Sequence, residues 1–203
     1  MLNAPIRFFS TIILTSIPAI ALAVDDDYRS EQYLGLGISR ISINSAHPSI
    51  HDQSISGITL LYGIRRDSFV FETVMGGGGG IDTEPTSDIY YPEDTADYGF
   101  ISFSFLYHFR DLQLQGNVVP YVGGGYSINS INWQTYVYDH SGDGYTFTAG
   151  AAFPIDRYWS VQGTFQYINF SGERILFSSG DYPNYNTETY LYSINVLYHF
   201  IDN

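Results

Sequence analysis

The sequence predicts an all-β fold, an eight-stranded antiparallel up-and-down transmembrane β-barrel. Three observations predict it. Large apolar and small polar residues alternate with a period of two through most of the chain, as they do in a strand with two different faces. Aromatic residues make up 17% of the chain and charged residues only 14%, fewer than a water-exposed surface normally carries. The alternating segments are each about ten residues long, which suits a tilted strand that crosses a bilayer.

The N-terminal segment predicts a cleaved signal peptide. In MLNAPIRFFSTIILTSIPAIALA, the single basic residue Arg7 precedes an apolar stretch, and the letters ALA form a small-x-small cleavage site before Val24. A membrane anchor is the alternative, but the apolar stretch is shorter than the ~20 residues that a helix needs to cross a bilayer. We therefore expect a signal peptide at 1–23 and one barrel domain at 24–203.

Eight strands are expected in the remaining chain, each with the alternation and length described above. The expected spans are 33–43, 55–65, 69–79, 98–109, 118–129, 144–154, 158–169 and 188–200. The connections after the second, fourth and sixth strands are short, and those after the first, third, fifth and seventh are longer, as at 81–99. Short turns at one end and long loops at the other are typical of an outer-membrane barrel.

Large apolar residues collect on one face of these strands, and small polar residues collect on the other. In the fourth strand, Phe103 and Phe105 alternate with Ser102 and Ser104. The residues expected to face lipid are Phe103, Phe105, Phe147, Phe165, Val196, Tyr198 and Phe200. Tyrosine and tryptophan near the strand ends are expected to lie at the membrane boundary as an aromatic girdle.

A water-soluble secreted barrel is the main alternative fold. Such a barrel fills its interior with apolar side chains and carries polar residues outside. An eight-stranded barrel is only just wide enough for side chains to fill, so roughly twenty large rings turned inward would overpack it. Rings turned outward suit lipid, and a closed barrel pairs every backbone group, as lipid demands. The pattern therefore favours the membrane barrel.

The chain ends on SINVLYHFIDN, a last strand that must close against the first. Three segments, VVPYVGGGYSI at 118–128, VQGTFQYINF at 161–170 and INVLYHF at 194–200, resemble strands of the small outer-membrane barrels of Gram-negative bacteria. That family contains the OmpA transmembrane domain, OmpX and the opacity proteins, within the wider porin family. The resemblance implies a location in the cell outer membrane.

The same resemblance implies that the terminal aromatic, Phe200, is a recognition signal for the outer-membrane assembly machinery. This chain departs from the pattern, since Ile201, Asp202 and Asn203 follow that residue. The resemblance is to members that consist of the barrel alone.

Two short segments contain residues that could support chemistry. GGGGG at 76–80 is followed by no Lys-Ser/Thr pair and no helix, which argues against a phosphate loop. We expect these glycines to let the strand bend outward or to leave space in the lumen. DHSGD at 139–143 offers Asp, His and Ser, but adjacent residues of a strand point to opposite faces, so a polar hairpin tip is expected there. We expect no catalytic site, no metal site and no cofactor.

Three polar residues are expected to face the lumen by their parity: Glu72, Arg65 and His108. Because a buried carboxylate needs a partner, we hypothesise that Glu72 pairs with Arg65 across the same hairpin and plugs the barrel. A hydrated Glu72 is the alternative.

Six acidic residues fall in the longest expected loop with no basic residue between them: Asp82, Glu84, Asp88, Glu93, Asp94 and Asp97. Oxygen ligands suit calcium or magnesium, but the spacing fits no EF-hand, so a solvated and self-repelling loop is favoured. Arg40, on the lipid-facing parity of the first strand, could contact a phosphate of lipopolysaccharide.

The sequence favours a structural or surface-interaction role, such as adhesion or recognition through the loops, and no enzyme. A narrow channel for small solutes or ions is the first alternative, and a lipid A-modifying enzyme is the second. The expected partners are outer-membrane lipid and lipopolysaccharide, the assembly machinery and an unknown extracellular ligand, with the protein itself a monomer. A net charge of −13 with eight basic residues argues against nucleic acid, and the lack of cysteine excludes disulfides and thiol chemistry.

Overall fold

A computed structural model describes residues 30–46, 50, 52–83, 94–112, 117–133, 139–175 and 185–200. The chain divides into two units, Met1–Ser30 and Glu31–Asn203, and the second unit holds all of the strands. The predicted signal peptide at 1–23 lies outside the described residues. Over the described residues, we find no helix with the length and apolarity needed to span a bilayer.

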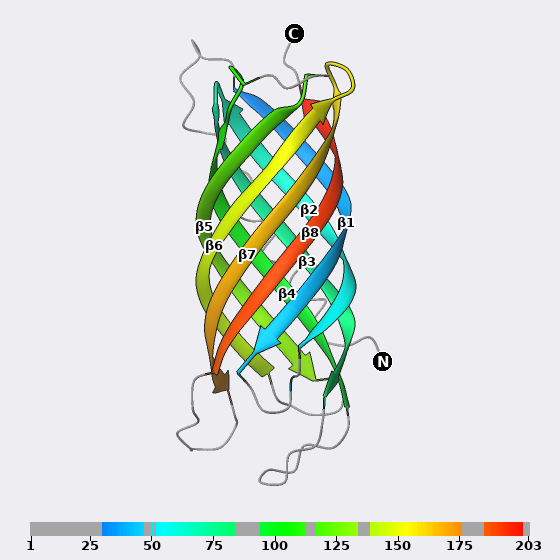
Figure 1. Ribbon diagram of the computed structural model, residues 1–203, viewed down its shortest axis with the longest axis vertical. Coiled ribbons are helices and arrows are strands. Elements are labelled where there is room, and N and C mark those ends of the chain that lie inside the picture. The colour runs from blue at the N-terminus through cyan, green and yellow to red at the C-terminus, as the bar shows by residue number, and fades with distance from the viewer. Residues whose placement is uncertain are drawn as a thin grey trace. The chain divides into compact units, whose positions relative to one another are not determined.

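The second unit is a closed antiparallel barrel in which each strand pairs with its neighbours in chain order (Figure 1). The strands are β1 (Glu31–Ser45), β2 (Gln53–Arg66), β3 (Phe69–Thr83), β4 (Asp94–His108), β5 (Val119–Trp133), β6 (Asp139–Pro154), β7 (Trp159–Ile175) and β8 (Tyr185–Phe200). β1 closes against β8 over a long ladder that runs from Gln32 opposite Phe200 to Ser45 opposite Thr187. The predicted fold class, strand order and closure of the last strand on the first are confirmed.

The two ends of the barrel differ in their connections. We call the end where β1 begins and β8 ends the turn end; its connections are 67–68, 109–118 and 155–158. The opposite end, with the connections that follow β1, β3, β5 and β7, is the loop end. The tight turns lie at the top of Figure 1.

The strands run further toward the loop end than predicted. β7 continues to Ile175, and β6 begins at Asp139, so the segment 139–143 is part of a strand and the expected hairpin tip is wrong. Because β3 continues to Thr83 and β4 begins at Asp94, the connection 84–93 is no longer than 109–118, and the predicted alternation of short and long connections is wrong there. The physical reason is that the outward residues of these extensions are polar, as Asp143 and Ser171 are, so the outward apolar period stops while backbone pairing continues.

Side-chain hydrogen bonds and backbone preferences fix the tight turns. Asp67, between β2 and β3, has a φ of 54°, a left-handed conformation that Asp tolerates better than most residues. Between β6 and β7, Asp156 Oδ1 accepts the backbone N–H groups of Tyr158 at 2.7 Å and Trp159 at 2.8 Å. Both turns are short and locally encoded.

The glycine run changes which face of β3 points inward. The glycines at 76–79 stay paired with β4 and do not bend away, and a bulge follows at Gly80, whose φ is +86°. The extra residue flips the parity, so that Ile81 points into the barrel and is fully buried. Gly76 faces inward, where an added Cβ would lie 2.8 Å from the ring of Phe100, so this glycine does leave space in the lumen.

The outer wall is apolar. Of the residues predicted to face lipid, six are between 38% (Tyr198) and 71% (Phe105) exposed on the outside, the other four being Phe103, Phe147, Val196 and Phe200. Phe165 also lies on the outer wall, half-buried against the ring of Tyr192 at a centroid distance of 5.2 Å. The small residues between them, such as Ser102 and Ser104, are buried in the lumen.

Candidate functional site

The lumen is filled by two different groups of side chains. Near the turn end lies a polar group, which we call the turn-end network: Glu31, Tyr33, Arg65, Glu72, Ser160, Gln162 and His199. Toward the loop end lies an apolar group, which we call the loop-end cluster: Ile41, Ile43, Ile81, Tyr98, Phe100, Ile131, Ile168 and Phe170. Both groups are candidates for closing the lumen.

A buried carboxylate lies at the centre of the turn-end network. Glu72 is 0% exposed, and its Oε2 accepts a hydrogen bond of 2.5 Å from the Tyr33 hydroxyl and a longer one of 3.5 Å from Gln162 Nε2. Its second oxygen, Oε1, has no hydrogen-bond partner among the described residues. A buried carboxylate is costly to leave without hydrogen-bond donors. The hydrogen bond from Tyr33 is the shorter of the two, so Tyr33 is the main donor to Glu72.

The strand register explains this pairing. Tyr33, Gly63 and Glu72 stand side by side on β1, β2 and β3, because Tyr33 lies opposite Gly63 and Gly63 lies opposite Glu72. A Cβ at Gly63 would overlap the Tyr33 ring, so the missing side chain lets the tyrosine reach across β2. Sequence reasoning missed Tyr33, since only the register reveals this row.

Arg65 has a different partner from the one predicted. The hypothesis paired it with Glu72, but Arg65 forms an ion pair with Glu31, which lies directly opposite it on β1. Glu72 lies opposite Gly63, which precedes Arg65 by two residues on β2. Arg65 is therefore only the diagonal neighbour of Glu72. The predicted Glu72–Arg65 pair is therefore wrong, although both residues do lie on the lumenal side.

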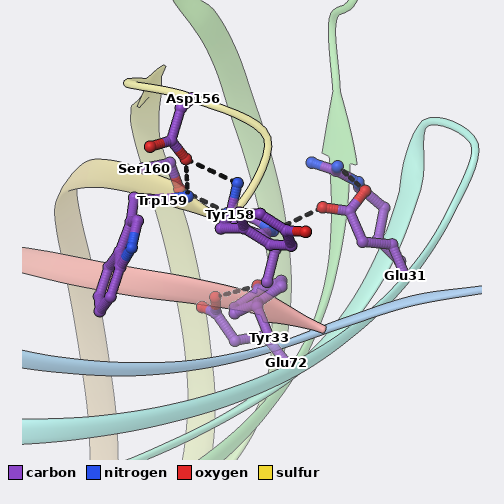
Figure 2. A network of polar contacts seen from close by, with 9 residues as sticks. Glu31, Tyr33, Glu72, Asp156, Tyr158, Trp159 and Ser160 are labelled. Carbon is purple, nitrogen blue, oxygen red and sulfur yellow. Dashed lines mark hydrogen bonds and ion pairs between the residues drawn. The ribbon is translucent and has the colours of Figure 1, made fainter. Parts of the chain in front are cut away.

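Glu31 also begins a chain of contacts that joins the first strand to the last two (Figure 2). Its Oε1 lies 2.5 Å from Nδ1 of His199 on β8, and Nε2 of His199 lies 2.7 Å from the hydroxyl of Ser160 on β7. His199 Nδ1 is close to the carboxylate without being aligned for a hydrogen bond. This series of contacts therefore links β1, β7 and β8 at the seam where the barrel closes.

Ser160, His199 and Glu31 contact one another in the order that a catalytic triad uses, with a nucleophile, a base and an acid that orients the base. Ser160 is only 4% exposed, and Arg65 already neutralises the acid. A substrate would have to enter the packed lumen to reach the hydroxyl. These contacts therefore fit a structural role at the seam better than catalysis.

His108, the third predicted lumenal residue, is 4% exposed at the end of β4. Its ring stacks on Tyr121 with a centroid distance of 5.0 Å and an interplanar angle of 14°. The Tyr121 hydroxyl is in turn 2.7 Å from that of Thr164 on β7. His108 thus lies beside the network without contacting Glu72.

The loop-end cluster is apolar and aromatic, unlike the small polar lumen that the sequence predicted. Tyr98 stacks on Phe100 at 5.8 Å and on Phe170 at 6.4 Å, between ring centroids. The buried Tyr98 hydroxyl donates a hydrogen bond of 2.8 Å to Asn129 Oδ1. Large rings therefore fill this part of the interior, as they do in water-soluble proteins.

Comparison with known proteins agrees with this architecture. The model of the family described as outer membrane protein beta-barrel domain matches residues 9–200. The chain belongs to this family. The protein is accordingly located in the outer membrane of a Gram-negative bacterium, and its apolar outer wall is the surface available to lipid.

Three solved outer-membrane barrels have similar structures. Neisserial surface protein A has a TM-score of 0.60 at 15% identity, over 83% of this chain and 97% of that one. OprG of Pseudomonas aeruginosa has a TM-score of 0.61 at 11% identity, over 86% and 98%. Ail, the attachment invasion locus protein of Yersinia pestis, solved with the heparin analogue sucrose octasulfate, has 0.55 at 12%, over 85% and 99%. A search of curated protein sequences finds no match.

The predicted acidic loop of this outer-membrane barrel is partly strand. Asp82 belongs to β3 and Asp94 and Asp97 to β4, while Glu84, Asp88 and Glu93 lie outside the described residues. The backbone N–H and C=O of Asp82 are both hydrogen-bonded to the Gln53 side chain at 2.9 Å. Across the described part of the chain, no group of three or more His, Asp or Glu side chains could hold a metal ion.

Proposed function

We propose that this outer-membrane barrel has a structural or surface-interaction role, adhesion or recognition exerted from its loop end, and that it catalyses no reaction. The observation that carries the proposal is the filled lumen. Side chains with 0–2% exposure come from both halves of the interior, including Tyr33 and Glu72 near one end and Phe100 and Phe170 near the other. A lumen with two packed layers in series favours contact with partners over passage through the barrel.

The orientation follows from the family architecture. Short turns of such barrels face the periplasm, and the opposite ends face outward. The loop end, where polar strand extensions rise past the apolar wall, would then be the surface presented outside the cell. Exposed segments on a rigid scaffold are where recognition usually occurs.

Charge indicates what kind of surface the loop end would meet. Ail was solved with a heparin analogue, a polyanion. The present chain has a net charge of −13, and its loop end carries exposed Asp82 and Asp97. An acidic surface repels a sulfated polyanion. We therefore propose a partner with a cationic surface.

The first experiment is a planar-bilayer recording of the purified barrel together with an adhesion assay. Wild-type protein should give no steady conductance. A non-adherent bacterial host that displays it should bind a surface coated with a lysine-rich peptide better than one coated with heparin. The Asp82→Asn, Asp97→Asn double variant should lose that preference, and Asp111→Asn, an exposed turn-end control, should keep it.

Reproducible single-channel conductance would overturn the proposal in favour of a narrow channel. Equal adhesion of the host with and without the barrel would reject the interaction role. Unchanged binding by the double variant would show that Asp82 and Asp97 at the loop end are not part of the contact surface.

A further inference from the structure

Arg40 is an exposed cation on the outer wall of the barrel. It points outward from β1, between Ser56 on β2 and Tyr192 on β8 in the strand register. Arg40 has no hydrogen-bond, ion-pair or ring partner among the residues that the structure describes. An exposed guanidinium on a lipid-facing wall, without a protein partner, would be stabilised by an anionic group from the membrane.

The level of Arg40 in the membrane can be read from its neighbours on the same face. On its turn-end side the outer wall is apolar, with Ile38 70%, Ile58 66% and Ile194 61% exposed. On its loop-end side the outward residues become hydroxyl-bearing, with Ser42 and Ser54 joined by a hydrogen bond of 2.7 Å. Arg40 therefore lies at the boundary between acyl chains and headgroups, where a cation is far less costly than at the bilayer midplane.

A pocket adjoins this boundary on the loop-end side. It has a volume of about 290 Å³ and is lined by Ser42, Ile43, Asn44, Asp52, Gln53, Ser54 and Tyr190. Six of the seven lining residues carry a hydroxyl, amide or carboxylate group, and these are the groups that hydrogen-bond the hydroxyls of a sugar. The carboxylate of Asp52 would repel a phosphate placed in the pocket itself, so a phosphate is better placed at Arg40.

We propose that Arg40 and this pocket bind a phosphorylated glycolipid of the outer leaflet. The guanidinium holds the phosphate, with the bidentate geometry that arginine offers to phosphate oxygens. The sugar occupies the polar pocket above, and the acyl chains lie along Ile38, Ile58 and Ile194 below. The three levels of the wall thus match the three parts of one lipid, in the same order.

Two other ligand classes fit less well. A glycerophospholipid offers a phosphate and acyl chains but leaves the polar pocket without sugar hydroxyls. A free phosphate or a soluble phosphosugar makes no use of the apolar wall. The proposal is also independent of the adhesive role, because it concerns the side of the barrel and not its rim.

The test is native mass spectrometry of the protein purified from outer membranes in a zwitterionic detergent. The probes are bisphosphorylated lipid A, enzymatically dephosphorylated lipid A and phosphatidylglycerol. Wild-type protein should bind lipid A most tightly, and Arg40→Gln should bind it about tenfold or more weakly, the usual size of a lost charge-assisted hydrogen bond. Arg110→Gln, at an exposed turn-end position, is the matched control and should bind as the wild type does.

Further variants separate the phosphate contact from the sugar contact. Arg40→Lys should give intermediate affinity, since it keeps the charge and loses the planar fork. The Ser42→Ala, Ser54→Ala double variant should lose the preference for lipid A over phosphatidylglycerol while its binding still depends on Arg40. Heat-modifiable mobility checks that each variant is folded.

Three outcomes would overturn the proposal. Arg40→Gln that binds lipid A as tightly as the wild type would remove the phosphate site. Equal losses in Arg40→Gln and Arg110→Gln would indicate general charge attraction. Wild-type binding of phosphatidylglycerol as tight as that of lipid A would reject a glycolipid as the ligand.

Discussion

The two halves of the lumen are closed by different physical means. Near the turn end, Glu72, Tyr33 and Gln162 form hydrogen bonds whose partners are set by the strand register. Toward the loop end, Tyr98 and Phe170 fill the space by stacking and burial. Hydrogen bonds require particular partners, whereas apolar packing requires volume. One barrel therefore contains a layer that depends on geometry and a layer that depends on bulk.

Removing bulk from the loop-end cluster should have the largest effect on stability. Phe170→Ala should lower the free energy of unfolding by about 3–5 kcal/mol, because a fully buried ring leaves a cavity. Urea unfolding in lipid vesicles, followed by heat-modifiable mobility, measures the loss. Phe147→Ala removes the same ring from the outer wall and should cost clearly less. Equal losses would show that the loop-end cluster is not a packed layer.

The next comparison is between the outer wall and the lumen. Phe103→Arg should destabilise the barrel by about 2–4 kcal/mol if its outward side chain faces the bilayer core. Ser104→Arg places the same charge in the lumen, where crowding and not lipid sets the cost. Unfolding of both variants in short-chain and long-chain lipid vesicles should show a dependence on bilayer thickness only for Phe103→Arg. Equal small losses in both would contradict the assignment of the two faces.

Breaking the buried hydrogen bond of the turn-end network should cost less than either. Tyr33→Phe should destabilise the barrel by about 1.5–3 kcal/mol, because Glu72 keeps only the long contact with Gln162. Adding Glu72→Gln to this variant removes the unsupported charge and should recover most of the loss. The double-mutant cycle on unfolding free energies measures the coupling. Additive losses would show that the two side chains do not depend on each other.

The smallest effect is expected at the seam. Ser160→Ala should cost about 1 kcal/mol, the usual net value of one neutral hydrogen bond, and should leave the fold intact. The wild-type protein should not react with a fluorophosphonate probe, because the hydroxyl is buried. Labelling that disappears in Ser160→Ala would instead make Ser160 a reactive nucleophile and reopen the enzyme hypothesis.

Much of the architecture could be predicted from the alternation alone. The outward positions of Phe103, Phe105 and Val196 follow from a period of two, which every strand obeys locally. Several strand ends were placed too early, because in the loop-end extensions the outward residues are polar and the apolar residues turn inward, as Ile81, Ile131 and Phe170 do. Tyr98 and Phe100 fall on the inward parity of the predicted strand 98–109, but their rings were missed because the lumenal face was expected to be small and polar along its whole length.

The candidate site was less predictable than the fold. Glu72 and Arg65 both lie on the lumenal side of the wall, and their partners are Tyr33 and Glu31. Each partner lies on β1, far away in sequence, and only the pairing of β1 with β2 brings it near. The β2–β3 hairpin considered by itself contains neither partner.

The eight strands, their outward apolar face and the closure of the last strand on the first could all be predicted from the amino-acid sequence, because alternation and segment length are local properties of the chain. The tertiary structure decided which side chains share a row, through the register that joins Tyr33, Gly63 and Glu72. It also decided the parity of β3 past its glycines, because the bulge at Gly80 turns Ile81 inward. Register and bulges depend on how neighbouring strands settle against each other, and no single segment contains that information.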